Sequence, residues 1–352
     1  MRRICTWVAS CIVIMTWKAA VAQAPLLESG TARRFAVIVG ANKGAMGRSP
    51  LRHSHHDAQA LGKVLVDVGG LRSDDVKVLL DPEPQVVLDS LDVALSSARS
   101  AGGESLVVFY YSGHADDEAL YPNGKPLALR QIRSSLDDER ATIRLGILDA
   151  CRGGAWTRTK GFSEVEPFAV VEPQGLSSEG AVLIASSSGH ENAHESDRLG
   201  GSFFTHHLVA GLRGAADRSG DGRVSLTEAF AFAQQGTIRD TAMISGSPQH
   251  PSFEMRLRGR NDVVLTQLDD ASSVLHVDQS QGPLQLVQLD TGLIVVELPE
   301  GPRKARLALA PGGYVVRRRS GDRIVAAREI TVESGKTVSI EEANLEVVGT
   351  QK

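Results

Sequence analysis

Short runs of aliphatic residues alternate with longer, helix-like stretches over the first two thirds of this 352-residue chain. The alternation predicts an α/β fold with a mostly parallel sheet. Because each run is apolar almost throughout, we expect helices on both faces of that sheet. The expected strands are Phe35 to Val39, Val76 to Leu80, Ser105 to Tyr111, Ile143 to Asp149 and Ala181 to Ser186. The expected helices between them are Asp57 to Val68, Pro84 to Ser100 and Leu127 to Leu136.

The pattern changes after Leu268. Short alternating runs such as Leu284 to Val287 and Gly313 to Arg317 are separated by turns rich in proline and glycine. We therefore expect an α/β domain at residues 33–268, followed at residues 269–352 by a small antiparallel β domain. That second part resembles the β-sandwich modules of bacterial surface proteins, and the sequence does not identify what it binds.

The N-terminus has the layout of a secretory signal. Arg2-Arg3 precede an apolar stretch from Ile4 to Trp17, and Ala20-Val21-Ala22 offers a small-residue cleavage site. We expect residues 1–22 to be removed, which leaves an extracytoplasmic protein, periplasmic or secreted, without a membrane span. An uncleaved anchor and lipidation at Cys11 are the alternatives.

Composition excludes one class of partner. The chain is 42% hydrophobic and 23% charged, as in an ordinary globular protein. Its formal charge of -4 becomes -7 without the signal, with 35 basic against 42 acidic residues. No basic patch is present, so we do not expect nucleic acid to bind.

Cys151 is the only cysteine that remains once the signal is removed. A lone thiol outside the cytoplasm cannot form a disulfide within its chain and is open to oxidation, which favours a catalytic role. Cys151 follows one expected strand and His114 follows another, and the carboxyl ends of parallel strands lie at one edge of a sheet. His114 would take the thiol proton and return it to the leaving amine, while the amides of Gly113 and Cys151 would stabilise an oxyanion. Alternatively, His114 has a structural role at a strand end.

These strand ends carry a family resemblance. Tyr111-Ser112-Gly113-His114 and Asp149-Ala150-Cys151-Arg152-Gly153, together with residues 35–40, 51–58 and 249–251, resemble the caspase and metacaspase superfamily, especially its secreted bacterial members. The resemblance spans about residues 34 to 268 and implies a caspase-like cysteine endopeptidase that needs no cofactor for its chemistry. One difference is Ala115, where the family often has a second glycine.

The resemblance also implies a substrate class. Metacaspases and paracaspases cleave after Arg or Lys with an acidic pocket, and their pocket acids match Asp57 and Asp149 here. Two carboxylates would bind a guanidinium through charge-assisted hydrogen bonds, so we expect polypeptide substrates with Arg or Lys before the cleaved bond. Asp57 could instead cap a helix, and Asp149 could cap a loop. Residues 186–188 and 191–195 are expected beside the cleft, and self-cleavage at Arg158 or Lys160 is a hypothesis from the family.

Residues 217–228 resemble the calcium loop of an EF-hand. Gly222 occupies the sixth position, and the twelve-residue spacing offers as candidate ligands Asp217, Ser219, Asp221, Arg223, Ser225 and Glu228. The same residues also form a capping box before an expected helix, so calcium binding and a purely structural turn are both open. His53, His55 and His56 do not have the spacing of a tetrahedral metal site, and we expect them at a partly exposed helix start.

Two other functions remain as alternatives. The first is a catalytically idle caspase-like scaffold in the cell envelope that works through binding. The second is a calcium-responsive structural module, which rests on the 217–228 loop alone. The presence of both Cys151 and His114 favours the enzyme.

Overall fold

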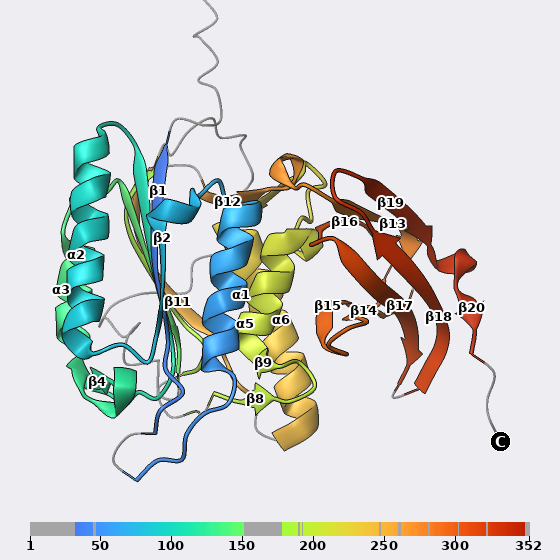
Figure 1. Ribbon diagram of the computed structural model, residues 1–352, viewed down its shortest axis with the longest axis horizontal. Helices are drawn as coiled ribbons and strands as arrows, with labels where there is room; N and C mark the ends of the chain where they lie inside the picture. The colour runs from blue at the N-terminus through green and yellow to red at the C-terminus, as the bar shows by residue number, and fades with distance from the viewer. Residues whose placement is uncertain are drawn as a thin grey trace, which may run out of the picture.

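The computed structural model describes residues 32–44, 47–150, 178–188, 191, 193–245, 248–259, 262–280, 282–301, 303–321 and 323–348. An α/β part and a β-sandwich lie side by side along the long axis of the molecule (Figure 1). Among the described helices, none combines the length and the apolarity that a membrane crossing needs.

A six-stranded sheet forms the centre of the α/β part. Its strand order is β11-β7-β6-β3-β1-β2, and every neighbouring pair is parallel except β11 with β7. β3 and β6 are buried along their whole length, in agreement with their continuous apolar sequences. The predicted mostly parallel sheet is confirmed. Its strands are β1 (Arg33–Gly40), β2 (Val76–Leu80), β3 (Ser105–Ser112), β6 (Ile143–Asp149), β7 (Ser178–Ala185) and β11 (Ser252–Gly259).

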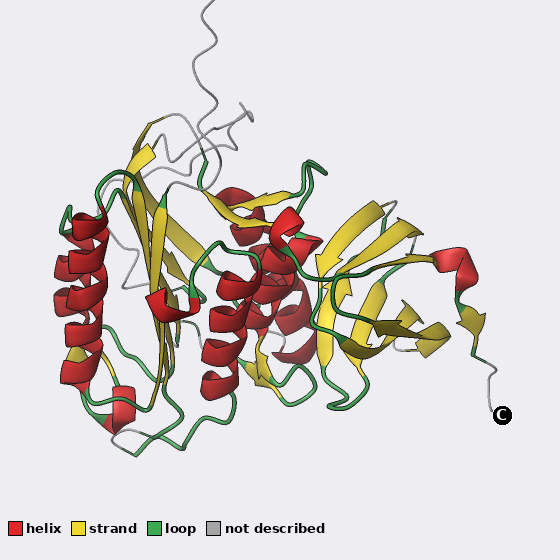
Figure 2. Cartoon of the chain, turned by 45° about the horizontal axis from the view of Figure 1, so that its top comes forward, coloured by secondary structure: helices red, strands yellow, loops and turns green. Residues whose placement is uncertain are grey.

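Helices cover both faces of the sheet (Figures 1 and 2). α2 (Pro84–Ala101) and α3 (Leu129–Asp137) pack on one face, and α1 (Ser54–Asp67), α5 (Phe203–Ala210) and α6 (Leu226–Ser245) lie on the other. Successive strand residues point to opposite faces, so Phe109 belongs to the core with α2, and Tyr110 to the core with α1 and α5. The expected two-sided cover is confirmed.

Some boundaries differ from the predictions. α1 begins at Ser54 rather than Asp57, and a short hairpin of β4 (Ala119–Leu120) with β5 (Leu127–Ala128) precedes α3. β11 was not predicted at all. It is an edge strand whose sequence includes Glu254, Arg256 and Arg258, because an edge can carry charges that a central strand cannot.

The C-terminal strands form a sandwich of two sheets around their own apolar core. The five-stranded sheet has the order β15-β14-β17-β18-β20, and the three-stranded sheet has the order β16-β13-β19. β13 and β19 are parallel, which differs from the antiparallel arrangement expected for this region, because the chain crosses to the other sheet between them. The strands are β13 (Val274–Ser280), β14 (Leu284–Gln288), β15 (Ile294–Leu298), β16 (Arg303–Ala308), β17 (Gly312–Ser320), β18 (Arg323–Val332), β19 (Thr337–Glu341) and β20 (Glu346–Val347).

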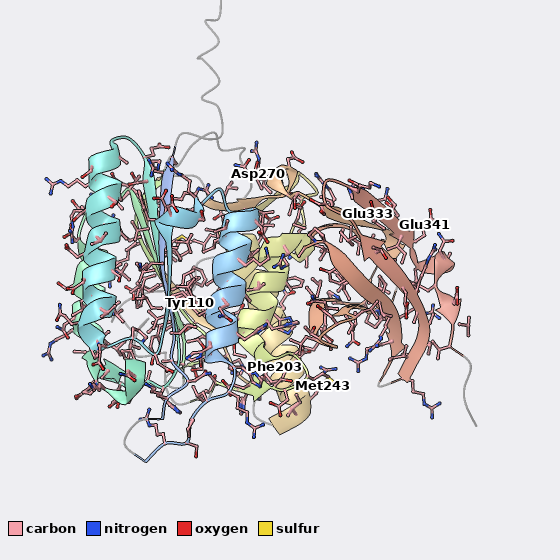
Figure 3. All side chains as sticks on the ribbon, in the orientation of Figure 1. Tyr110, Phe203, Met243, Asp270, Glu333 and Glu341 are labelled. Atoms are coloured by element: carbon pink, nitrogen blue, oxygen red, sulfur yellow. The ribbon has the colours of Figure 1, made fainter. Side chains whose placement is uncertain are left out.

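The sandwich packs directly on the α/β part. Phe203 at the start of α5 forms a small apolar cluster with Leu199, Val287 and Ile294, and β15 contacts α5 (Figure 3). Deeper in the α/β part, the Tyr110 hydroxyl lies 2.6 Å from Thr205 Oγ1, which joins β3 to α5 inside the core. α5 is thus held on one side by the parallel sheet and on the other by the sandwich.

Candidate active site

The ends of β3 and β6 lie side by side, as predicted. Ser112 pairs with Asp149 in the parallel register, and the backbone N–H of Gly113 donates to the carbonyl of Asp149 at 3.2 Å. His114 and Ala150 follow immediately, so His114 lies beside the segment that leads to Cys151. The predicted nucleophile Cys151 and the processing candidates Arg158 and Lys160 lie outside the described residues.

The His114 imidazole has a defined partner. Its Nε2 lies 2.8 Å from the carbonyl oxygen of Ser49. A carbonyl can only accept, so Nε2 carries the proton and Nδ1 of the neutral ring is left as a base. The backbone of His114 is held as well, because its carbonyl accepts hydrogen bonds from the Tyr111 hydroxyl at 2.7 Å and the Tyr121 N–H at 3.0 Å.

Gly113 is required by packing. A Cβ at this position would lie 2.6 Å from the Tyr111 hydroxyl and 2.9 Å from Ala41 Cβ, so a larger residue would displace the tyrosine that supports His114. The Gly113 N–H, predicted to stabilise an oxyanion, is engaged with Asp149 in this structure. That role requires the hydrogen bond to open during catalysis.

Arg48 joins the segment that carries Ser49 to the His114 loop. Its Nη1 donates to the carbonyl of Ala115 at 2.7 Å, and its guanidinium lies 5.2 Å from the centre of the Tyr121 ring. The Asp116 carboxylate lies 3.7 Å from Arg48 Nη2. These contacts fix the carbonyl that orients the histidine.

Asp57 and Asp149, the two predicted pocket acids, converge on Ser202. The Ser202 N–H donates to Asp57 at 3.2 Å, and its hydroxyl donates to Asp149. Ser202 is also the N-cap of α5, and its Oγ accepts the N–H of Thr205 at 3.0 Å. The Thr205 hydroxyl donates to Asp149 Oδ2 at 2.5 Å, and the Ser112 hydroxyl donates to Asp57 at 3.2 Å. The start of α5 therefore holds both carboxyl groups.

Neither acid caps a helix. Asp57 lies inside the first turn of α1, whose N-cap is His53, and its carboxyl group points to Ser202 and Ser112. The exposed fractions of Asp57 and Asp149 are 2% and 3%, and Asp149 Oδ1 has no hydrogen-bond partner among the described residues. The alternative that Asp57 caps α1 is wrong, and the alternative that Asp149 caps the following loop concerns residues outside those described.

Burial perturbs both carboxyl groups. Loss of hydration raises the pKa of Asp57 well above its usual value, and the negative charge of Asp149 raises it further. Burial also raises the pKa of Asp149, against the opposing effect of the hydrogen bonds from Ser202 and Thr205. The two buried acids therefore retain a proton at pH values where exposed carboxyls are ionised.

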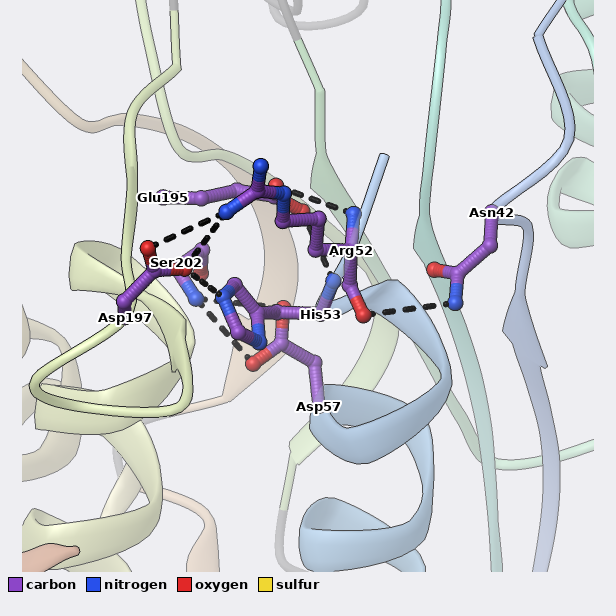
Figure 4. Close-up of polar contacts among 7 residues, drawn as sticks. All are labelled: Asn42, Arg52, His53, Asp57, Glu195, Asp197 and Ser202. Atoms are coloured by element: carbon purple, nitrogen blue, oxygen red, sulfur yellow. Dashed lines mark hydrogen bonds and ion pairs between the residues drawn. The ribbon is translucent and has the colours of Figure 1, made fainter. Parts of the chain in front are cut away.

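A small pocket of about 30 Å³ opens between His114 and Asp149. Glu195 borders it as a second carboxylate, and Asp57 lies behind Asp149 rather than at the pocket surface. Glu195 accepts hydrogen bonds from the N–H groups of Arg52 and His53, both at 3.2 Å (Figure 4). The residues 191–195 expected beside the cleft thus include a pocket acid.

Gln249 and His250 hold the neighbouring loop. The Gln249 side chain donates to the carbonyl of Ser186 at 2.7 Å and accepts from the N–H of His194 at 3.1 Å. His250 Nδ1 lies 2.7 Å from Glu191. The segment 249–251, whose sequence resembles the family, thus holds the loop beside the pocket through these hydrogen bonds.

The three histidines at the start of α1 do not form a metal site. His53 pairs with Asp197 at 2.8 Å and His55 pairs with Asp81 at 3.0 Å, in different directions from the helix. A different trio, His207, Asp240 and Glu297, brings its ligand atoms within 4.8 Å of one another. Arg239 already contacts Asp240 at 2.7 Å and Arg319 lies 3.8 Å from Glu297, so arginines supply the positive charge there.

The predicted calcium loop, residues 217–228, is closed by hydrogen bonds among its own residues. Asp217 accepts the N–H groups of Gly220 at 2.8 Å and Gly222 at 3.0 Å, and Glu228 turns back to the N–H of Arg218 at 3.3 Å. Gly222 has a φ of 81°, a conformation that favours glycine. These hydrogen bonds are the ones expected of a purely structural turn. Calcium binding remains a prediction.

Three functional groups carried no sequence signal. Ser202, Thr205 and the Ser49 carbonyl are single polar groups without a recognisable motif, and they lie far along the chain from the residues they contact. The only available hint was the cap position of Ser202 before a helix-like stretch.

One protein-family model covers the α/β part of the chain. Residues 33–260 match the family model described as the caspase domain. Among solved structures, caspase-1 from Spodoptera frugiperda is similar with a TM-score of 0.49 and 16% identity, over 74% of this chain and 100% of that one. No curated protein matches the sequence significantly.

Proposed function

The chain belongs to the caspase-domain family of cysteine peptidases, and on that premise we propose that it hydrolyses polypeptides after Arg or Lys through a Cys151–His114 dyad. The observation that carries the proposal is the pair of buried acids held by Ser202 next to the His114 pocket. Among the described residues no cation pairs with these carboxyl groups, which fits a site whose cation arrives with the substrate.

The proposed chemistry begins with proton transfer from the Cys151 thiol to Nδ1 of His114, whose Nε2–H stays on the Ser49 carbonyl. The thiolate attacks the scissile carbonyl carbon and forms a C–S bond, and the electron pair moves to the oxygen. Collapse of this tetrahedral species breaks the C–N bond, and the imidazolium gives its proton to the leaving amine. Water then hydrolyses the thioester with His114 as the base, which restores the thiol.

Specificity in this proposal rests on Asp149 and Glu195, with Asp57 behind them. Asp149 and Glu195 both line the pocket, and a planar guanidinium can engage more than one carboxylate oxygen. A pocket of about 30 Å³ holds a water molecule or two, so an arginine side chain enters only if the loop of residues 193–195 moves outward.

Two further proposals concern context. The signal-like N-terminus supports an extracytoplasmic enzyme, and the closed 217–228 loop supports a weak calcium site that would stabilise the α5–α6 connection. Both are independent of the dyad.

The deciding experiment is cleavage of fluorogenic peptides that end in Arg, Lys, Gln or Asp. Wild type should cleave the Arg and Lys peptides, and the Cys151→Ala and His114→Ala variants should not. Faster cleavage of the Asp peptide would support peptidase activity but contradict the acidic specificity pocket. No turnover of any peptide, including after limited proteolysis, would favour the idle scaffold.

A further inference from the structure

A cavity of about 350 Å³ lies between the α/β part and the β-sandwich, and residues of α1, α5, β14, β15 and β17 line it. It is distinct from the pocket beside His114. Ligand sites of this size are common at domain interfaces, and the chemistry of the walls indicates which ligand would bind.

Two cations, Arg213 and Lys63, border the cavity together with the carboxyl group of Asp57, whose pKa is raised by burial. Arg213 is 8% exposed, and its one hydrogen bond to a described residue joins Nη1 to the carbonyl of Ala308 at 3.2 Å. Its nearest carboxylate oxygen is on Asp67, 3.9 Å away, and Asp67 already pairs with Lys63 at 2.9 Å. Two cations that border the cavity thus share one carboxylate, and the remaining N–H donors of Arg213 are free for an anion.

A buried imidazole also borders the cavity. His206 borders the cavity with 9% of its surface exposed, and its Nε2 has no hydrogen-bond partner among the described residues. Burial lowers the pKa of His206 well below its usual value, so the ring is neutral at pH 7 and offers one hydrogen bond without a charge. An unmet polar atom at this depth is costly unless a ligand or water satisfies it.

The rest of the lining is largely apolar. Leu199 and Val209 on the α/β side face Ile294 and Leu309 on the sandwich side. We propose that this cavity binds a small organic carboxylate with an apolar body, with its carboxylate on Arg213 and its apolar part between the two domains. Asp57 also borders the cavity, and Ser202 connects it to Asp149. An occupant can therefore influence the specificity pocket, a consequence that rests on the proposed function, whereas binding itself does not.

The test measures binding, in the full chain carrying Cys151→Ala, so that peptidase activity plays no part. Hexanoate is titrated calorimetrically, with hexanamide as the neutral probe of the same length. Hexanoate should bind at least about tenfold more tightly, because a charge-assisted hydrogen bond exceeds a neutral one by about 1.4 kcal/mol or more.

Variants locate the site. Arg213→Met should weaken hexanoate binding about tenfold and Arg213→Lys much less, since the lysine keeps the charge. Ala60→Leu fills the cavity from α1 and should abolish binding, whereas Arg99→Met removes an exposed arginine on α2 and should change nothing.

The proposal is overturned if hexanamide binds as tightly as hexanoate, or if carboxylates from acetate to octanoate show no binding. It is also overturned if hexanoate binds the Ala60→Leu protein as it binds wild type. Ala60→Leu keeps the test decisive even if Arg213→Met does not fold, because it leaves the Arg213 contacts in place.

Discussion

Asp149→Asn is the sharpest perturbation of the specificity pocket. The asparagine keeps the size of the side chain and one oxygen acceptor for Ser202 and Thr205, but it removes the negative charge. The substitution therefore separates the charge of the pocket from its shape.

The expected loss of transition-state binding follows from the burial of the Asp149 carboxyl group. Removing one charge of a buried pair costs about 3–5 kcal/mol. The remaining carboxylate of Glu195 and a neutral hydrogen bond to the asparagine, worth about 1 kcal/mol, offset part of this cost. We expect a net loss of about 3 kcal/mol in transition-state binding of Arg peptides, which corresponds to about a hundredfold in kcat/KM.

The assay compares kcat/KM for peptides that end in Arg and in Gln. A neutral glutamine gains nothing from the carboxylate, so the Arg-to-Gln ratio should fall about a hundredfold in Asp149→Asn. The matched control is Asp197→Asn, since Asp197 is 73% exposed and pairs with Arg52 and His53 near the same site. An unchanged Arg-to-Gln ratio of kcat/KM in Asp149→Asn, or an equal fall of that ratio in Asp197→Asn, would contradict the prediction.

Three further predictions concern other parts of the molecule. Arg48→Met should lower kcat about tenfold with little change in KM and should shift the pH profile of kcat/KM, because Arg48 positions the Ser49 carbonyl on His114. An unchanged pH profile, or no partial rescue of kcat by Arg48→Lys, would contradict this prediction. Calcium at about 10 mM should raise the Tm by about 3 °C in wild type and not in Glu228→Gln, given a Kd of about 1 mM; equal melting curves with and without calcium would dismiss the site. The Tm of Asp57→Asn, followed by circular dichroism from pH 4 to 8, should decline less with pH than that of wild type. Because the pKa of Asp57 is raised in the folded state, its protonated form contributes its full stabilisation below the unfolded-state pKa, and this contribution is lost as pH rises toward the folded-state pKa. Parallel plots of Tm against pH for the two proteins would refute the prediction.

The sheet and the position of His114 at the end of β3 were predictable because they depend on local patterns. β2 and β6 have the predicted bounds, since their apolar runs stop where charged or glycine-rich sequence begins. The convergence of the two strand ends follows from the parallel sheet alone. β11 could not be predicted in this way, because its pairing with β7 is carried by backbone groups and its side chains are mixed.

The acid cluster depends instead on contacts between distant residues. Ser202 lies 145 residues from Asp57 and 53 from Asp149, and a single serine has no periodic signal. The sequence could not decide whether Asp57 caps α1 or enters the pocket, because both roles place it near the helix start. The start at Ser54 excludes the cap, since Asp57 then lies in the first turn of α1, and its carboxyl group accepts from Ser202 at the start of α5 without lining the pocket beside His114.

If the proposed function is right, we expect the buried acids to link substrate binding to proton release. Burial raises the pKa of Asp57 and of Asp149, so the free protein keeps a proton that a bound guanidinium would expel. Affinity for Arg peptides should therefore rise with pH over the same range in which the stability of the free enzyme falls. Measuring the inhibition constant of a non-cleavable arginine peptide on Cys151→Ala across pH 5 to 8 tests this without interference from the titration of the dyad. Binding that is independent of pH would mean that both carboxylates are already ionised in the free enzyme, and that the pocket is balanced by a charge other than that of the substrate.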